Sequence, residues 1–332
     1  MRSSRGDAPA PFDVPCDDGV VGVLADDRSL TTVLAFTPGP ARPGVTDLLP
    51  TDVVHRWRSG PDADAVDVRV FTQEAAIGGG PAGAAYRGLL GPLPLVAHRT
   101  VHLTIRFDAR SAVAARYGTG GAGALRACRS VTRRLIAALG AAGVAARALP
   151  AAGITAAAAA IDPAEPTVYA SRADEPVPLT GDGILVGAAD DGSPVAMRLA
   201  GLPRCVVDGG TELAARLAVR LVATGSSCAV FTDRPQCWRP VVDAVGDRSL
   251  LHPAADGPAD VLIDDRAGHR LGAVPGRTVL EIGAGTQSSE PVIREGSDGR
   301  LTVSGGGRRL TVAPVTTTAE SALVRAPVVT GR

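Results

Sequence analysis

The sequence predicts a mixed α/β (α+β) fold with two lobes, in which short β-sheets pack against amphipathic helices. Stretches that alternate between apolar and polar positions follow stretches with helical spacing along the whole chain. Prolines and acidic residues concentrate at 162–183, which predicts a linker. We therefore expect a disordered lead-in at 1–18, an N-terminal α/β lobe at 19–161 and a C-terminal α/β lobe at 184–326 that ends in β-hairpins.

Alternation and turn residues predict the strands of the N-terminal lobe. These are 20–25, 30–36, 65–71 and 99–107, with a return strand within 140–149. Helical spacing predicts helices at 47–59, 81–90 and 123–139. The strand at 99–107 has the clearest pattern, because all large apolar side chains fall on one of its faces. That face holds Val101, Leu103, Ile105 and Phe107, and the other holds Thr100, His102, Thr104 and Arg106.

The helix predicted at 123–139 carries an unusual number of arginines on its polar side. These are Arg126, Arg129, Arg133 and Arg134. One interpretation is a solvated polar face. The other is a docking surface for an acidic partner, because guanidinium groups pair with carboxylates through two parallel hydrogen bonds.

The C-terminal lobe is predicted to alternate between strands and helices before its terminal hairpins. Strands are expected at 184–189, 194–201, 260–265, 277–285, 300–305 and 308–315, and a strand followed by a turn at 228–235. Helices are expected at 211–225 and 236–246. With 332 residues and 45% apolar content, the chain is long enough to bury a sizeable core.

The composition argues against several classes of protein. The 34 basic residues, all arginine, balance 34 acidic ones, so no overall field attracts nucleic acid. Aromatic content of 3% leaves few platforms on which bases could stack. The five cysteines form no CxxC pair, which favours reduced thiols. No apolar leader and no apolar run of about 18 to 20 residues occurs in the chain as written, so we expect a soluble protein.

The stretch RTVLEIGAGTQ at 277–287, with apolar residues, an acid and then Gly283-x-Gly285, resembles the cofactor loop of S-adenosylmethionine methyltransferases. Gln287 stands where a third glycine is expected, and the short stretch that follows is predicted to form hairpins rather than βα units. We therefore favour an ordinary strand and turn. The other glycine clusters lack the spacing and the lysine of a phosphate-binding P-loop.

Two further groups of residues could hold a metal ion. His98 and His102 are four residues apart on or next to one strand, and Asp264 and Asp265 end another. Thr104 and Arg106 are poor metal partners for the histidines, so we expect His98 and His102 to be ordinary strand residues. We expect Asp264 and Asp265 to be solvated carboxylates at the end of their strand. The residues therefore predict no metal, no cofactor and no catalytic site.

Several segments together resemble EccE, a core component of the actinobacterial type VII (ESX) secretion machinery. They are LTTVLAF, GPLPLVAHRTVHLTIRFD, GALRACRSVTRRLIAALGAAGVAARAL and CAVFTDRPQCW, with an FDVP start at Phe12. The similarity extends from Phe12 to the C-terminus and is strongest at 86–149. It implies a non-catalytic scaffold subunit of the ESX membrane complex, not an enzyme.

The resemblance also implies partners and a location. The partners would be the ubiquitin-like-domain membrane subunit and the FtsK/SpoIIIE-type ATPase of the complex, with no nucleic acid. Family members usually carry N-terminal membrane helices before such a cytosolic domain. The chain as written has none, so we expect it at the cytoplasmic face of the cell membrane, attached through its partners. The alternative hypothesis is an α/β-fold transferase, either a methyltransferase or a nucleotide-sugar glycosyltransferase.

Overall fold

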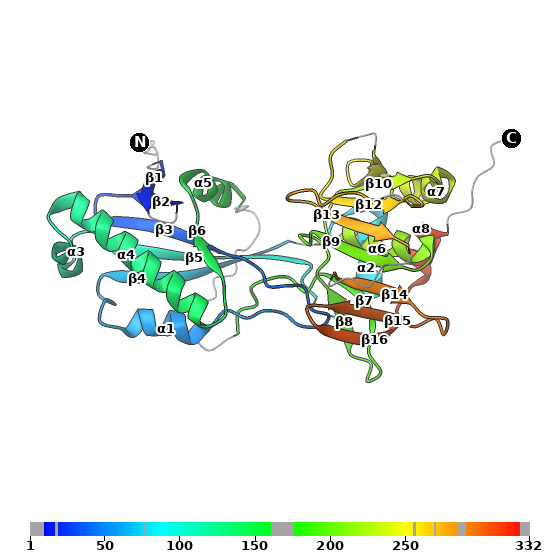
Figure 1. The fold of residues 1–332 in the computed structure, drawn as a ribbon, viewed down its shortest axis with the longest axis horizontal. Coiled ribbons are helices and arrows are strands. Elements are labelled where there is room, and N and C mark those ends of the chain that lie inside the picture. The colour runs from blue at the N-terminus through cyan, green and yellow to red at the C-terminus, as the bar shows by residue number, and fades with distance from the viewer. Residues whose placement is uncertain are drawn as a thin grey trace, which may run out of the picture. The chain divides into compact units, whose positions relative to one another are not determined.

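The computed structural model describes residues 10–16, 19–75, 77–93, 95–160, 176–254, 257–268, 270–283 and 290–325. Contacts between residues divide the chain into two compact units (Figure 1). Unit 1 comprises Met1–Gly39, Asp47–Gln73 and Arg99–Thr180, and unit 2 comprises Pro40–Thr46, Glu74–His98 and Gly181–Arg332. Each unit contains helices and a β-sheet, so the predicted mixed α/β class is confirmed. Among the described residues, every helix is too short or too polar to cross a membrane.

Unit 1 contains a six-stranded sheet of order β1-β2-β3-β5-β4, with β6 paired to β3. The strands are β1 (Phe12–Cys16), β2 (Gly19–Ala25), β3 (Ser29–Phe36), β4 (Val66–Ala75), β5 (His98–Asp108) and β6 (Ala146–Ala148). The helices are α1 (Thr51–Ser59), α3 (Ala112–Arg116), α4 (Gly120–Ala141) and α5 (Ala151–Ala160). The long helix α4 crosses the sheet, with α1 on the same side (Figure 1).

The core of unit 1 follows the predicted alternation of β5. Val101, Leu103, Ile105 and Phe107 are buried together with the apolar side of α4. The other face of β5 is partly or fully exposed.

One expectation for this unit is wrong. Residues 12–16 form the edge strand β1 rather than disordered chain, because they pair with β2 in antiparallel register from Phe12↔Val23 to Cys16↔Gly19.

Unit 2 contains a ten-stranded sheet of order β11-β10-β12-β13-β9-β14-β15-β16-β7-β8. In chain order the strands are β7 (Ile184–Ala188), β8 (Pro194–Met197), β9 (Arg204–Asp208), β10 (Cys228–Thr232), β11 (Leu251–Pro253), β12 (Val261–Asp265), β13 (Thr278–Ile282), β14 (Val292–Glu295), β15 (Leu301–Gly305) and β16 (Arg308–Pro314). The part from β11 to β14 is parallel, and the part from β14 to β8 is antiparallel. The strands predicted at 300–305 and 308–315 correspond to β15 and β16, whereas β14 lies outside the predicted strands.

The helices of unit 2 pack against one another and share one core with the strands. They are α2 (Gly80–Leu90), α6 (Thr211–Ala223), α7 (Pro235–Val245) and α8 (Thr318–Val324). Helix α2 comes from residues 74–98, which the sequence-based division assigned to the N-terminal lobe. It clusters with unit 2 because Tyr86, Leu89 and Leu90 are buried in the core of that unit. Residues 162–175 of the predicted linker lie outside the described residues.

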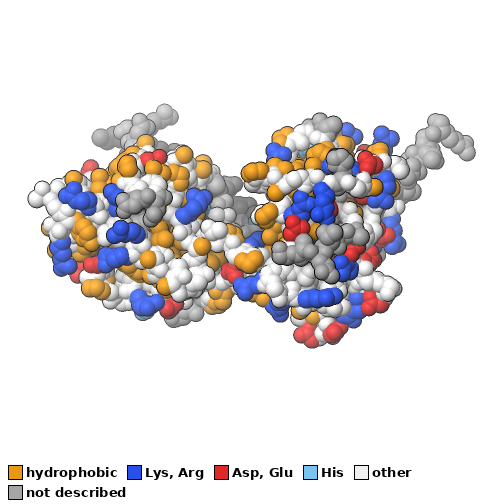
Figure 2. All heavy atoms as spheres, in the orientation of Figure 1, with side chains coloured by type: hydrophobic (Ala, Val, Ile, Leu, Met, Phe, Trp, Pro, Cys, Tyr) orange, Lys and Arg blue, Asp and Glu red, His pale blue; other side chains and the backbone are white. Residues whose placement is uncertain are grey.

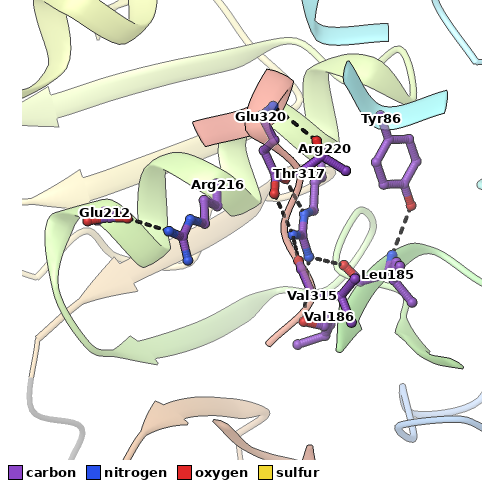
Figure 3. A network of polar contacts seen from close by, with 9 residues as sticks. All are labelled: Tyr86, Leu185, Val186, Glu212, Arg216, Arg220, Val315, Thr317 and Glu320. Carbon is purple, nitrogen blue, oxygen red and sulfur yellow. Dashed lines mark hydrogen bonds and ion pairs between the residues drawn. The ribbon is translucent and has the colours of Figure 1, made fainter. Parts of the chain in front are cut away.

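A buried ion pair connects α8 to α6 (Figure 3). The Arg220 guanidinium on α6 donates from Nε to Glu320 Oε1 over 2.6 Å and from Nη2 to Oε2 over 2.8 Å. It also donates to the carbonyl oxygens of Leu185 at 2.5 Å and Val315 at 2.6 Å. Both charged side chains are at most 3% exposed. One guanidinium therefore connects α6, α8, β7 and the segment after β16.

Two glycines of α2 give a matched stability prediction. A Cβ at Gly83 would lie 1.8 Å from the carbonyl oxygen of Gly78, whereas a Cβ at Gly88 would meet nothing within 4 Å. We expect Gly83→Ala to lower the free energy of unfolding by roughly 1–3 kcal/mol through overpacking. Gly88→Ala should raise it by about 0.5–1 kcal/mol, because alanine loses less backbone entropy in a helix. Urea denaturation of both variants tests this, and equal effects would contradict it.

Candidate functional site

The position of the polar flank of α4 follows from the burial of the apolar side of this helix. Ala124, Ala127, Cys128, Val131, Leu135 and Leu139 recur at helical spacing and are buried against the sheet. Arg126, Arg129 and Arg133 are spaced three and four residues apart, so they follow one another along a single flank of the helix. Basic and hydrophobic side chains gather on the face of unit 1 that α4 crosses (Figure 2).

Beside this flank, the sheet of unit 1 splits. One edge of β3 is shared by two strands, because β2 pairs with Thr31 and Leu30 while β6 pairs with residues from Leu34 to Phe36. The first half of β2 therefore leaves β3 and remains paired with β1. A backbone hydrogen bond from Gly22 N to Leu149 O at 2.8 Å connects β2 to the residue that follows β6.

A groove of about 720 Å³ lies between α4, the β1–β2 hairpin and β6. We call it the α4 groove. Its apolar lining comes from Cys16, Val20, Val21, Tyr117, Ile136, Ala146, Ala148 and Pro150. Four arginines also line it, namely Arg126, Arg129, Arg133 and Arg147, together with Ser130 and Thr132. No carboxylate occurs among the described lining residues, so the groove is both apolar and basic.

The arginines of the groove differ in how they are held. Arg126 donates from Nε to the carbonyl oxygen of Tyr117 at 2.8 Å, which fixes it beside the turn between α3 and α4. Arg129 is half-buried and has no hydrogen-bond or ion-pair partner among the described residues. Arg147 is an exposed residue of β6. A half-buried guanidinium without a carboxylate partner is a ready contact for an external acid.

Arg134 is separate from this group. Its Nη2 lies 2.8 Å from Asp62 Oδ2, and its guanidinium stacks over the ring of Trp57 with 5.2 Å to the centroid. Both partners belong to unit 1, so Arg134 serves the packing of α4 against α1 and its following turn. The structure brings together three of the four arginines singled out in the sequence.

Sequence reasoning missed Arg147 and the wall formed by β1 and β2. Arg147 belongs to a strand that returns after α4, and nothing in its sequence context marks it as a neighbour of Arg129. The pairing of β6 with β3 brings them to one groove. Alternation in the return strand could have identified Arg147 as facing away from Ala146 and Ala148.

Residues 95–175 match a family model described as the putative type VII ESX secretion system translocon, EccE. The EccE resemblance is confirmed over this segment. It begins just before β5 and includes α3, α4, β6 and α5, and hence two walls of the α4 groove. The match relates this segment to a family described as a component of the type VII secretion translocon. The comparison with curated proteins finds no match.

Outside this EccE segment, the Gly283 turn does not have the surroundings expected for it. Strand β13 lies between β12 and β9 in parallel ladders, so it is an inner strand of a parallel sheet. The sequence-based expectation of hairpins applies only to the chain after it. The next described element is the strand β14, which begins at Val292, whereas a cofactor loop of this class leads into a helix. Gly285 and Gln287 lie outside the described residues.

The two carboxylates that end β12 are each engaged by protein donors. Asp264 accepts from Arg266 Nε and from Leu271 N, both at 2.8 Å. Asp265 accepts from Trp238 Nε1 at 2.8 Å, from Thr232 Oγ1 at 2.9 Å and from Arg234 Nη2 at 2.5 Å. Both are almost fully buried rather than solvated as expected. As neighbours on one strand they point to opposite faces of the sheet, which does not favour a shared ion.

The two histidines belong to different units. His98 Nε2 lies 3.4 Å from Ser226 Oγ in unit 2, whereas His102 belongs to unit 1 and lies opposite Ala35 in the ladder. Burial lowers the pKa of both imidazoles, and nearby Asp260 partly opposes this for His98. No group of three or more metal-ligating side chains occurs among the described residues. The α4 groove therefore remains the strongest candidate site.

Proposed function

We propose that this chain is a non-catalytic structural subunit of a type VII (ESX) secretion complex. It would act at the cytoplasmic face of the membrane and hold other subunits through the α4 groove. The subunits with a ubiquitin-like domain and with an FtsK/SpoIIIE-type ATPase domain are the proposed partners.

The α4 groove supports this proposal most directly. It lies largely in the EccE segment and combines an apolar lining with basic side chains. Protein interfaces favour buried arginine and aromatic anchors, and Arg129 and Tyr117 are available for such a role. The transferase alternative has no comparable support, because the carboxylates that end β12 already have protein partners.

Charge reversal tests the role of the groove in assembly. We expect Arg129→Glu combined with Arg133→Glu to reduce co-purification with the other complex subunits at least roughly tenfold, which corresponds to about 1.4 kcal/mol. The physical reason is that two guanidinium–carboxylate contacts would become like-charge contacts. The measurement is the yield of partner subunits on the tagged variant, with circular dichroism as the control for folding.

A matched variant controls for net charge. Arg116→Glu combined with Arg309→Glu changes the charge equally, at two exposed arginines outside the groove. Co-purification of this variant should equal that of the unmodified chain. If the groove variant also kept its partners, the arginines would form a solvated face and the proposed role of the groove would be wrong.

A further inference from the structure

Among the described residues, one edge of β6 has no paired strand, and the ladder shows which backbone groups lie on it. Thr37 N donates to Ala145 O at 2.9 Å, and Leu149 N donates to Val33 O at 2.8 Å. In an antiparallel ladder the residues bonded to the partner strand alternate, so Arg147 bonds to β3 opposite Ala35. The N–H and C=O groups of Ala146 and Ala148 therefore point away from β3. Among the described strands, β6 is paired with β3 alone.

The strand β2 presents a second edge toward the same space. Gly22 donates its N–H away from β1, to Leu149 O. Val20 is two residues earlier on the same strand, so its N–H and C=O groups point the same way. Val20 is also 46% exposed, although it lies in a strand and lines the groove. The α4 groove is therefore bounded by backbone edges on two sides and is closed at one end by the Gly22–Leu149 hydrogen bond.

The side chains around these edges select for a particular kind of segment. Unpaired strand edges are templates for added strands, and main-chain hydrogen bonds supply affinity in such complexes. Successive side chains of an added strand point to opposite faces. Ala146 and Ala148 pack on the α4 side of β6, so Arg147 lies on the other face. A segment that alternates acidic and apolar residues would direct its carboxylates to the α4 side, toward Arg129, and its apolar side chains to the opposite face, where Val20 is exposed.

We propose that the α4 groove binds an extended segment of a partner protein with alternating acidic and apolar residues, by strand addition along β6. This inference rests on the proposed function, because the partner would be another subunit of the secretion complex. It specifies the segment that the partner presents. This is an exposed extended segment that can pair with a strand edge and that carries acidic side chains on one face.

Two cysteines of the chain allow occupancy of the α4 groove to be measured directly. Cys16 lines the groove and is partly exposed, whereas Cys237 is an exposed residue of α7 in unit 2. The other three cysteines are buried, and burial raises the pKa of Cys128 and of Cys205 to about 12 and that of Cys228 further. Maleimide should therefore label Cys16 and Cys237, and a ligand in the groove should protect Cys16 alone.

The probe is a short synthetic peptide in which glutamate and valine alternate, added to the full chain. We expect it to slow maleimide labelling of Cys16 at least roughly tenfold at saturation, with Cys237 unaffected as the internal reference. A peptide with lysine in place of glutamate should not protect Cys16. The glutamate peptide N-methylated at alternate residues should bind at least roughly tenfold more weakly, because it loses the main-chain donors that strand addition needs.

Variants of the chain separate the charge contacts from the fold. Arg129→Glu should weaken peptide binding at least roughly tenfold, and Arg116→Glu should leave it unchanged. Fluorescence anisotropy of the labelled peptide gives both affinities. Circular dichroism establishes that the variants are folded.

Each contrary result has a defined meaning. Absence of Cys16 protection, or equal binding of the N-methylated peptide, would overturn strand addition. Stronger Arg129-dependent protection by vesicles containing phosphatidylglycerol than by the peptide would replace the protein segment with a membrane surface. If the peptide failed while charge reversal still released the chain from its complex, only this inference would be lost and the proposed function would stand.

Discussion

Replacement of Arg220 by alanine is expected to lower the free energy of unfolding by about 3–5 kcal/mol, because it leaves the Glu320 carboxylate buried without its partner. The guanidinium makes four hydrogen bonds to Glu320, Leu185 and Val315 (Figure 3). Its loss also leaves buried carbonyl oxygens unsatisfied. Guanidinium chloride denaturation should show the change as a lower midpoint for unit 2.

A double replacement distinguishes a buried ion pair from simple loss of packing. Arg220→Met combined with Glu320→Leu removes both charges and keeps apolar volume, so it should cost much less than Arg220→Ala alone. Arg325→Ala is a surface control, since its ion pair with Glu212 is exposed and should contribute less than about 1 kcal/mol. A double variant as unstable as the single one would mean that the carbonyl contacts of Arg220, rather than its charge, hold α8 in place.

Replacement of Phe107 by alanine is expected to lower the free energy of unfolding by about 3–5 kcal/mol as well, through a cavity in the core of unit 1. Phe107 is fully buried on β5 and lies opposite Leu30 of β3. Hydrogen exchange should show the loss of protection in β3, β5 and α4. Thr104→Ala, on the other face of β5, should change stability by less than about 0.5 kcal/mol.

The two core variants also test the division into units. Phe107 belongs to the apolar core of unit 1, whereas Arg220 is a buried charged residue of α6, a helix whose apolar side chains belong to the separate core of unit 2. We therefore expect Phe107→Ala to spare the slowly exchanging amides of α6 and β10. Equal loss of protection in both units would contradict the presence of separate cores.

The elements that sequence reasoning found are those with a strong local pattern. The strand β5 follows from strict alternation, and α4 follows from buried side chains that recur at helical spacing. The elements that it missed are short or locally ambiguous, such as β1, which follows Pro11 and contains Pro15, and α8, with seven residues. Their positions depend on partners distant in sequence: β1 requires the edge of β2, and α8 requires Arg220 on α6.

Sheet order is a second property that local patterns do not contain. The strand β9 lies between β13 and β14, which are separated from it by long stretches of chain. The sequence showed a strand before Gly283 but not its parallel neighbours, because strand pairing is decided by long-range packing of apolar faces.

For the candidate site, the sequence by itself determined that Arg126, Arg129 and Arg133 share one flank of a helix, because helical periodicity is a local property. Only the tertiary structure decided that Arg134 pairs with Asp62 and that Arg147 joins the groove. Ion pairs and strand edges depend on which distant elements meet, and no periodicity of one segment encodes the side chains of another. The same reason explains the α4 groove itself, which exists because β6 displaces the first half of β2 from β3.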